Sequence, residues 1–258
     1  MKNNRINKVF VNKKQNVLNI YFTAGYPNLN DTGTIIKKLS EAKVDIIELG
    51  IPYSDPLADG LTIQDSSQKA LSNGISLNKV FDQVGAIKND HDTAIVMMGY
   101  FNQFLQYGID KLISRIVETG VDGLIIPDLP MDHYKSKYKT KFEEAGIAFS
   151  FLITPETSDE RIKEADTLTS GFLYVVAQSS ITGGVQDVSN KQKEYFERIQ
   201  DMELTSPRLI GFGIHNKETF DNACQFAEGA IIGSAFIRNL KSHGTDGIHD
   251  FVNNIIKS

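Results

Sequence analysis

Two acidic side chains, Glu48 and Asp59, lie within one short stretch, residues 44–60 (VDIIELGIPYSDPLADG). The β-branched run that opens the stretch predicts a buried strand, and because side chains alternate along a strand, Glu48 ends an otherwise apolar face. Gly50 and Pro52 end the strand, and the turn-forming residues after them place Asp59 on a loop. Two carboxylates in such different surroundings suit a general acid and a general base that work at one pH.

A structural role for the same two residues is the alternative. Glu48 could form an ion pair with a buried cation, and Asp59 could cap the helix predicted after it, since carboxylates at strand ends also take part in structural ion pairs. The residues alone leave both interpretations open.

The rest of the chain alternates short apolar runs with longer amphipathic ones. This alternation predicts parallel strands joined by helices, and eight such units in 258 residues favour a single-domain (β/α)8 TIM barrel over residues 1–258. Thr23-Ala24-Gly25-Tyr26-Pro27 after the first strand carries no dinucleotide fingerprint, which argues against an open doubly wound sheet. The predicted strands are 17–23, 44–49, 93–98, 121–126, 147–153, 171–176, 208–211 and 229–232, and the predicted helices are 31–42, 63–71, 77–88, 110–119, 134–145, 159–167, 190–202, 216–227 and 245–257.

An additional helix is predicted at the amino terminus. Ile6, Val9 and Phe10 recur at helical spacing. The basic segment around them lacks the apolar core of about 7 to 15 residues that a signal peptide needs. We therefore expect this helix to close one end of the domain.

Composition excludes several classes of function. The net charge of −5 and the lack of a basic stripe argue against nucleic acid, and no run approaches the roughly 18 apolar residues of a membrane span, so a cytoplasmic protein is expected. Cys224 is the only cysteine and is predicted to be a small core residue. No metal site is expected, because the histidines lack ligand spacing and are predicted to lie at the surface: His91, His133, His215, His243 and His249.

The carboxyl ends of the last two predicted strands carry small residues suited to an anion. Gly211-Phe212-Gly213-Ile214 follows one strand, and Gly233-Ser234-Ala235 follows the next at the start of a predicted short helix. Backbone N–H groups at such positions bind phosphate in many barrels, and Thr182-Gly183-Gly184 could add donors. With aromatic residues at other strand ends, the sequence predicts a phosphorylated aromatic substrate. Proton transfer would then drive isomerisation, elimination or aldol-type cleavage.

The stretch ELGIPYSDPLADG, residues 48–60, resembles the signature of the tryptophan synthase alpha chain family. The resemblance extends through residues 22–27, Asp128-Leu129-Pro130, Gly211-Phe212-Gly213-Ile214 and Gly233-Ser234-Ala235. It implies a lyase of tryptophan biosynthesis that cleaves indole-3-glycerol phosphate to indole and glyceraldehyde 3-phosphate. In that reaction Glu48 would protonate indole C3 and accept the side-chain hydroxyl proton, while Asp59 would take or stabilise the indole N–H proton.

The resemblance also implies the remaining site residues and a partner. Thr182 would hydrogen-bond Asp59 when a lid closes, and Asp55 and Pro56 would face a beta chain in an alpha2beta2 heterotetramer. Pyridoxal phosphate would belong to that beta chain, and this chain would carry no cofactor. The substrate would be lined by Phe22, Tyr100, Ile125, Tyr174 and Phe212, and its phosphate would be held by Gly183, Gly213, Gly233 and Ser234.

One loop departs from the family pattern. Residues 178–184 read QSSITGG, where many relatives have an arginine and then a serine-glycine pair, and Ser180 in place of glycine should stiffen the hinge. Two alternatives stay open from the residues. One is another enzyme of the phosphate-binding barrel group, although no lysine is found at a strand end, and the other is an inactive alpha-like subunit that regulates a beta chain.

Overall fold

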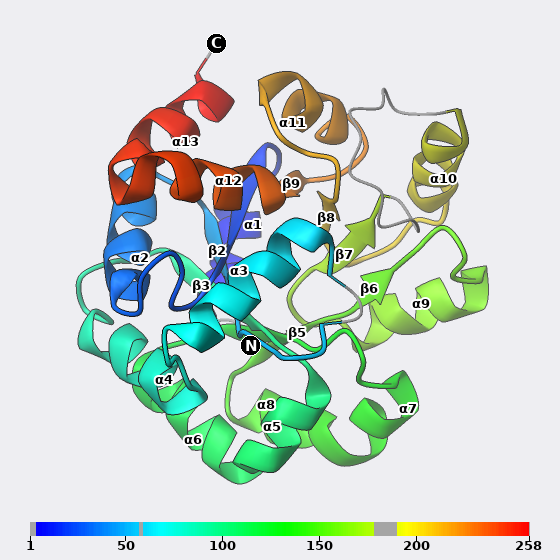
Figure 1. Ribbon diagram of the computed structural model, residues 1–258. Helices are drawn as coiled ribbons and strands as arrows, with labels where there is room; N and C mark the ends of the chain where they lie inside the picture. Colours follow the sequence, from blue (N-terminus) through cyan, green and yellow to red (C-terminus); the bar gives the residue numbers. More distant parts are fainter. Residues whose placement is uncertain (1–3, 57–58, 178–189, 258) are drawn as a thin grey trace.

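Parallel strands form a barrel that helices surround in the computed structural model, which describes residues 4–56, 59–177 and 190–257 (Figure 1). The strands are bonded in the order β5-β4-β3-β2-β1-β9-β8-β7-β6, and every pair is parallel. The strands are β1 Val17–Thr23, β2 Ile46–Gly50, β3 Ala94–Met98, β4 Gly123–Ile125, β5 Ala148–Ser150, β6 Leu152–Ile153, β7 Leu173–Val176, β8 Arg208–Gly211 and β9 Gly229–Ile232.

The fifth predicted strand closes the barrel. It is interrupted at Phe151, so that β5 pairs with β4 on one side and β6 pairs with β7 on the other. Two backbone hydrogen bonds continue the second side, from Gly171 N to Phe149 O at 3.1 Å and from Tyr174 N to Phe151 O at 2.9 Å. The predicted TIM barrel is therefore confirmed, with one strand divided into two short pieces.

The helices follow the predicted alternation with three differences. A helix not predicted, α5, follows Tyr100; it is only seven residues long and buries only Phe104, too short an apolar pattern to detect. The predicted helix 134–145 begins with a π-helical turn, and the last helix begins at Ile248 after a 3₁₀ turn. The helices are α1 Arg5–Asn12, α2 Asp31–Glu41, α3 Leu61–Ser72, α4 Leu77–Ala86, α5 Phe101–Tyr107, α6 Ile109–Thr119, α7 Met131–His133, η1 Tyr134–Tyr138, α8 Lys139–Glu144, α9 Asp159–Leu168, α10 Asn190–Asp201, α11 Lys217–Ala223, α12 Ser234–His243, η2 Gly244–Gly247 and α13 Ile248–Ile256.

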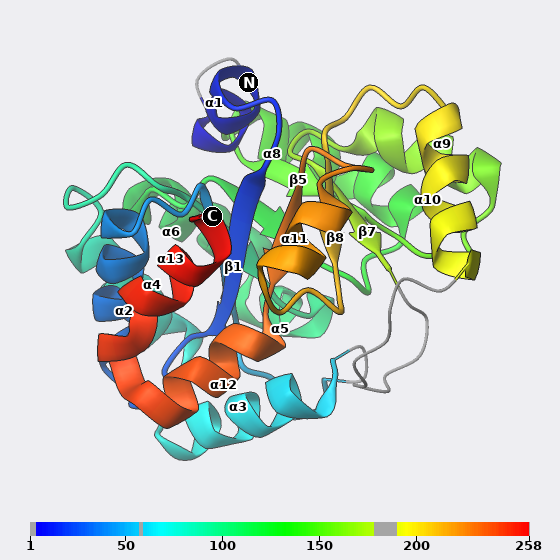
Figure 2. The ribbon, with the colours of Figure 1, turned by 90° about the horizontal axis from the view of Figure 1, so that it is seen from above.

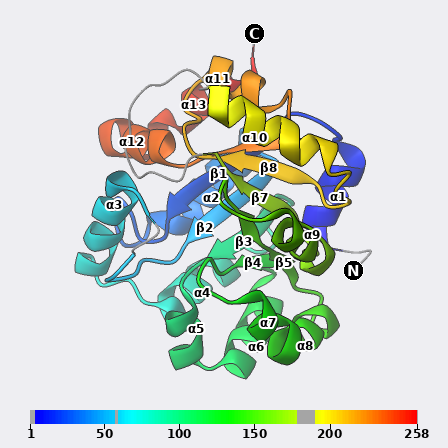
Figure 3. The same ribbon diagram turned by 90° about the vertical axis from the view of Figure 1, so that its right-hand side faces the viewer.

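The amino-terminal helix closes the end of the barrel where the strands begin, as predicted. Figures 2 and 3 show α1 at the end opposite to α3 and α12. Ile6 is fully buried. A Cβ atom on residue 123 would lie 2.9 Å from the Cδ1 atom of Ile6, so glycine at this position makes room for the helix. Arg5 forms an ion pair with Asp122 at 2.9 Å, which fixes the helix against the start of β4.

Two predictions about single residues have different outcomes. Cys224 is 6% exposed, and burial raises the pKa of its thiol to about 11, as expected for an unreactive core residue. The prediction that all histidines lie at the surface is wrong for His91, which is 8% exposed. Burial and the charge of Arg5 lower the pKa of His91, so the neutral ring is favoured there. Within the described part of the chain, no helix is long and apolar enough to cross a membrane.

Candidate active site

Glu48 lies inside the barrel, on β2. Glu48 is only 1% exposed. Asn19 Nδ2 on β1 donates a hydrogen bond to Glu48 Oε2 at 3.1 Å. The other oxygen, Oε1, has no hydrogen-bond partner among the described residues. Burial raises the pKa of Glu48 to about 8, with the Asn19 hydrogen bond opposing the shift and the charge of Asp59 adding to it. No ion pair to Glu48 is found within the described ranges, so the structure does not favour the buried-cation interpretation.

Asp59 lies on the loop between β2 and α3. Tyr100 donates a hydrogen bond from its hydroxyl to Asp59 Oδ2 at 3.2 Å. The residue that caps α3 is Gly60, without a side-chain hydrogen bond, so Asp59 does not serve as the helix cap. Burial raises the pKa of Asp59 to about 6, and the Tyr100 hydrogen bond opposes that shift. At neutral pH, Glu48 is therefore mostly protonated and Asp59 mostly ionised, which are the states of a general acid and a base.

Two tyrosines flank the carboxylates. Tyr21 lies opposite Glu48 in the register of β1 and β2. Burial raises the pKa values of Tyr21 and Tyr174, and the charges of both Glu48 and Asp59 raise them further, which places all four side chains around one space. Each ring lies across a glycine of the next strand: a Cβ atom on Gly50 would lie 2.1 Å from the Tyr21 hydroxyl, and one on Gly211 would lie 2.4 Å from the Tyr174 hydroxyl.

The prediction that Phe22 lines the site is wrong. Asn19 reaches Glu48 from β1, and because side chains alternate along a strand, Tyr21 shares the face of Asn19 while Phe22 points to the other face. Phe22 is fully buried in the core outside the strands. Tyr21 takes the predicted place of Phe22. Alternation along β1 puts Asn19 and Tyr21 on one face. The sequence could have identified both residues only if it had shown that this face of β1 points toward Glu48.

The aromatic and apolar residues predicted on the other strands have mixed settings. Tyr100 is 8% exposed and stacks on Tyr53 with ring centroids 5.1 Å apart. Ile125 is fully buried on β4, in register with Met98 of β3. Gly50 shares the face of Glu48 on β2, because side chains alternate along a strand. Gly50 is in register with Met98 of β3, and Met98 with Ile125 of β4. Ile125 therefore faces the barrel interior with Glu48.

The end of the barrel predicted to bind phosphate contains a sharp turn after β8 and a helix start after β9. Phe212 and Gly213 have φ angles of 73° and 80°, a left-handed pair that turns the chain sharply after β8. Gly233 precedes α12, and Ser234 begins it. The first-turn N–H groups of a helix have no partner within it, so they suit a phosphate group. Phe212 also meets Tyr174 edge-on, with centroids 6.4 Å apart, which brings this end close to the carboxylates.

Several predicted residues are not placed with the site. Thr182 and Gly183, together with Gln178, Ser180 and Gly184, lie outside the described residues. Asp55 is exposed and accepts a hydrogen bond from Ser54 at 2.5 Å, and Pro56 is half-buried beside it. Their role toward a partner stays a prediction.

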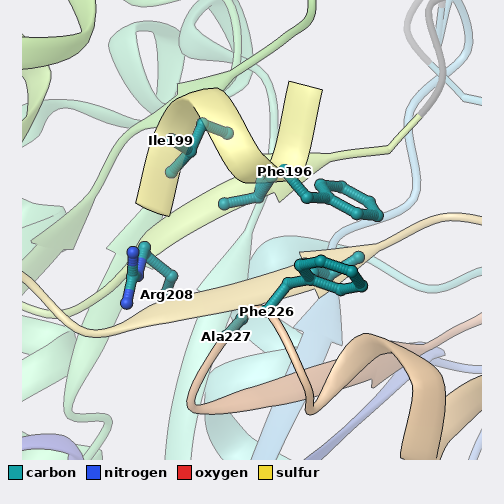
Figure 4. Close-up of a pocket in the computed structure, with 7 residues that line it drawn as sticks. Phe196, Ile199, Arg208, Phe226 and Ala227 are labelled. Carbon is teal, nitrogen blue, oxygen red and sulfur yellow. The ribbon is translucent and has the colours of Figure 1, made fainter. Parts of the chain in front are cut away.

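A shallow hollow lies elsewhere, between α10 and the outer side of β8 (Figure 4). Phe196 and Phe226 face each other there at 5.5 Å, and Arg208 is paired with Glu228 at 3.0 Å. Ile210 lines this hollow, and the alternation of side chains puts the neighbouring Gly211 on the face of Tyr174 instead. The hollow is therefore separate from the carboxylates, and we assign the chemistry to the barrel interior.

Burial of Glu48 should make stability depend on pH. Its pKa is about 8 in the folded chain, against an ordinary value of 4.5. The folded state therefore holds the proton more tightly, unfolding releases it between these values, and the free energy of unfolding falls as pH rises through this interval. Glu48→Gln removes the contribution, so the variant is expected to be roughly 2 to 4 kcal/mol more stable than the parent at pH 9 but similar to it at pH 4.

Urea unfolding of both proteins at pH 4, 6.5 and 9 measures this difference. Other titrating groups are common to the two chains and cancel in the comparison. Parallel stability curves would contradict the shift assigned to Glu48.

A TIM barrel with one carboxyl group in its interior, a second on the loop after the same strand and a helix amino terminus after its last strand is typical of phosphate-binding barrel enzymes that work by proton transfer. The chain matches the tryptophan synthase alpha chain family over residues 8–257 and belongs to that family. It is a lyase subunit that carries out the alpha reaction of L-tryptophan biosynthesis.

Individual relatives agree with this assignment. The chain is 51% identical over 252 residues to the tryptophan synthase alpha chain of Flavobacterium psychrophilum, covering 98% of this chain and 99% of the relative. Among solved structures, the tryptophan synthase A-subunit of Pyrococcus furiosus is 32% identical with a TM-score of 0.86, covering 94% of this chain and 98% of that one. A tryptophan synthase complex from the same organism is 31% identical with a TM-score of 0.85, covering 94% and 98% of the two chains.

Proposed function

We propose that Glu48 and Asp59 together catalyse the retro-aldol cleavage of indole-3-glycerol phosphate to indole and glyceraldehyde 3-phosphate. The protonated carboxyl of Glu48 donates its proton to indole C3. Asp59 accepts or stabilises the indole N–H proton, so that the ring nitrogen shares the positive charge. The Glu48 carboxylate then takes the proton of the side-chain hydroxyl, the C–C bond breaks, its electron pair returns to the ring, and the hydroxyl carbon becomes the aldehyde.

One observation carries this proposal: the two carboxyl groups share one space but have pKa values of about 8 and about 6. An acid protonated at neutral pH can give a proton to carbon and recover one from oxygen in the same turnover. A second carboxylate that is ionised at that pH stabilises the cation formed between the two steps. Tyr21 and Tyr174, which border both groups, supply flat aromatic surface for a bicyclic ring.

The phosphate of the substrate would be bound at the end of the barrel beyond Tyr174. Gly213, Gly233 and Ser234 offer backbone N–H groups there, and Gly183 would add another. In this proposal Thr182 hydrogen-bonds Asp59 when residues 178–184 close over the substrate, which fixes the carboxylate and excludes water. The hydroxyl of Tyr100 also donates a hydrogen bond to Asp59.

A tryptophan synthase beta chain is the proposed partner, in an alpha2beta2 heterotetramer. Support comes from the family and from the structural likeness to a tryptophan synthase complex. Asp55 and Pro56 would contact the beta chain, since the loop that carries them leads directly to Asp59 and Asp55 is exposed. Pyridoxal phosphate would be bound by the beta chain alone and would supply the chemistry that uses the indole.

The test is to mix the purified chain with indole-3-glycerol phosphate, with and without a beta chain, and to measure indole. We expect slow release by the chain alone and a gain of about 10- to 100-fold in the complex, which corresponds to about 1.4 to 2.8 kcal/mol of activation free energy. A chain that only regulates its partner would release no indole in either condition, and that result would end the proposed function.

A further inference from the structure

Asn19 is the one side chain that donates a hydrogen bond to Glu48 among the described residues. It is fully buried on β1, and its Nδ2 atom lies 3.1 Å from Glu48 Oε2. Two neighbouring atoms, Asn19 Oδ1 and Glu48 Oε1, are buried without a hydrogen-bond partner in the described part of the chain. Buried polar atoms are paired in the great majority of cases, so two orphans in one contact call for an explanation.

The explanation follows from the proton that Glu48 gives and takes back, and it therefore rests on the proposed function. A carboxylate needs a donor beside it, whereas a carboxylic acid also needs an acceptor for its O–H. A side-chain amide offers both, because a rotation of about 180° about the Cβ–Cγ bond exchanges Nδ2 and Oδ1. Asn19 Oδ1 is thus the acceptor that the protonated form of Glu48 can use.

We propose that Asn19 is a positioning residue that holds Oε2 of Glu48 in both of its protonation states and so leaves Oε1 for the substrate. A lysine or arginine at position 19 would fix Glu48 as a carboxylate, and an apolar residue would leave its orientation undefined. A side-chain amide can hydrogen-bond to both the protonated and the ionised form of Glu48.

The other ionisable groups facing Glu48 do not replace Asn19. Asp59 approaches from the loop after β2, Tyr21 from β1 and Tyr174 from β7. Asp59 accepts a hydrogen bond from the Tyr100 hydroxyl, and the Tyr21 hydroxyl lies 3.5 Å from Thr23 Oγ1. Across the neighbouring strand, the residue in register with Glu48 is Val96, which is apolar.

The experiment replaces Asn19 with the similarly sized Leu and Asp and measures two quantities. One is the titration of Glu48 by carbon-13 NMR of labelled glutamate carboxyls, assigned by difference from Glu48→Gln. The other is the pH profile of kcat for indole release by the complex with a beta chain. The matched control is Thr119→Val on α6, which removes a buried hydroxyl that donates to Arg115 O at 2.7 Å and makes no contact with Glu48.

Asn19→Leu is expected to lower kcat about 10- to 100-fold. It should also raise the pKa of Glu48, with the alkaline limb of the profile, by about one unit, because the hydrogen bond from Asn19 to the ionised carboxylate is stronger than the one to the neutral acid. A weaker acid protonates carbon more slowly, so both changes have one cause. Asn19→Asp should make Glu48 titrate in two steps, because two adjacent carboxyl groups share a proton. Thr119→Val should leave the titration of Glu48 where it is in the parent.

The outcomes separate this proposal from the proposed function. If Asn19→Leu lowers kcat without moving either the titration or the alkaline limb, the residue is only structural and the proposal is overturned. If Asn19→Leu moves the titration but Glu48→Gln keeps full turnover, Glu48 is not the acid, and both proposals fail. An inactive Glu48→Gln together with an Asn19→Leu identical to the parent overturns the role of Asn19 alone.

Discussion

Glu48→Gln is expected to release indole about 10² to 10⁴ times more slowly than the parent at neutral pH, because its amide cannot serve as the acid that protonates indole C3. Glutamine has the shape of the protonated carboxyl and can still accept the hydrogen bond from Asn19 Nδ2, which lies 3.1 Å from Glu48 Oε2. The substitution therefore removes the transferable proton while preserving the packing of a residue that is 1% exposed. Steady-state indole formation in the complex with a beta chain measures the loss.

Two controls make this loss interpretable. Binding of glycerol 3-phosphate, measured by calorimetry, should be unchanged, because the proposed phosphate site involves Gly213, Gly233 and Ser234 rather than β2. Glu118→Gln changes an exposed carboxylate on α6 that pairs with Arg115, and it should keep full turnover. Unchanged turnover in Glu48→Gln would require another group to be the acid.

The same substitution is expected to stabilise the chain at alkaline pH, and the two results together would show a trade-off. A carboxyl with a pKa of about 8 costs stability whenever it ionises inside the barrel. Catalytic groups are often held in surroundings that an apolar or neutral residue would fill more favourably. A variant that is more stable and nearly inactive would mark Glu48 as a residue kept for chemistry.

The barrel could be predicted from the sequence because strands and helices alternate with different periods. The strand at 147–153 was predicted as one element, and only the hydrogen bonds reveal its interruption at Phe151. The helix after Tyr100 was missed because seven residues carry too little periodicity. Local patterns thus specify where elements lie, while their ends depend on tertiary hydrogen bonds.

The site was predictable in part for a related reason. Glu48 and Asp59 could be recognised from residue type and from the strand end between them. Phe22 was taken from the family resemblance, and the sequence could not correct it to Tyr21, because a strand buried on both faces gives no signal for which face looks inward. The pairing of β1 with β2 sets Tyr21 opposite Glu48 and brings Asn19 within reach of that carboxyl. This register depends on how the two strands pair, which the sequence of either strand does not show.

The glycines at two strand ends show how pairing and chemistry are linked. Gly50 and Gly211 come at the carboxyl ends of β2 and β8, and each gives a tyrosine of the adjacent strand room to lie flat. Without a Cβ atom at those positions, the rings of Tyr21 on β1 and Tyr174 on β7 can reach toward the two carboxylates. Glu48, which lies between them in the charge interactions, is itself buried, and that burial raises its pKa.

Asp59→Asn is expected to lower kcat about 100-fold and to remove the acidic limb of the pH profile, because the variant has no carboxylate to stabilise the indole N–H as C3 is protonated. In the parent, activity requires Asp59 ionised and Glu48 protonated. With pKa values of about 6 and about 8, kcat/KM should rise through pH 6, reach a maximum near pH 7 and fall through pH 8. The variant should keep only the fall at alkaline pH.

Tyr100→Phe supplies the matched comparison for Asp59. It removes the hydroxyl that donates to Asp59 Oδ2 at 3.2 Å but leaves the carboxylate in place. Because that hydrogen bond opposes the effect of burial on the pKa of Asp59, its loss should move the acidic limb to higher pH without abolishing it. The acidic limb belongs to Asp59 only if one substitution removes it and the other displaces it upward; a limb that persists near pH 6 in Asp59→Asn would assign that ionisation to another group.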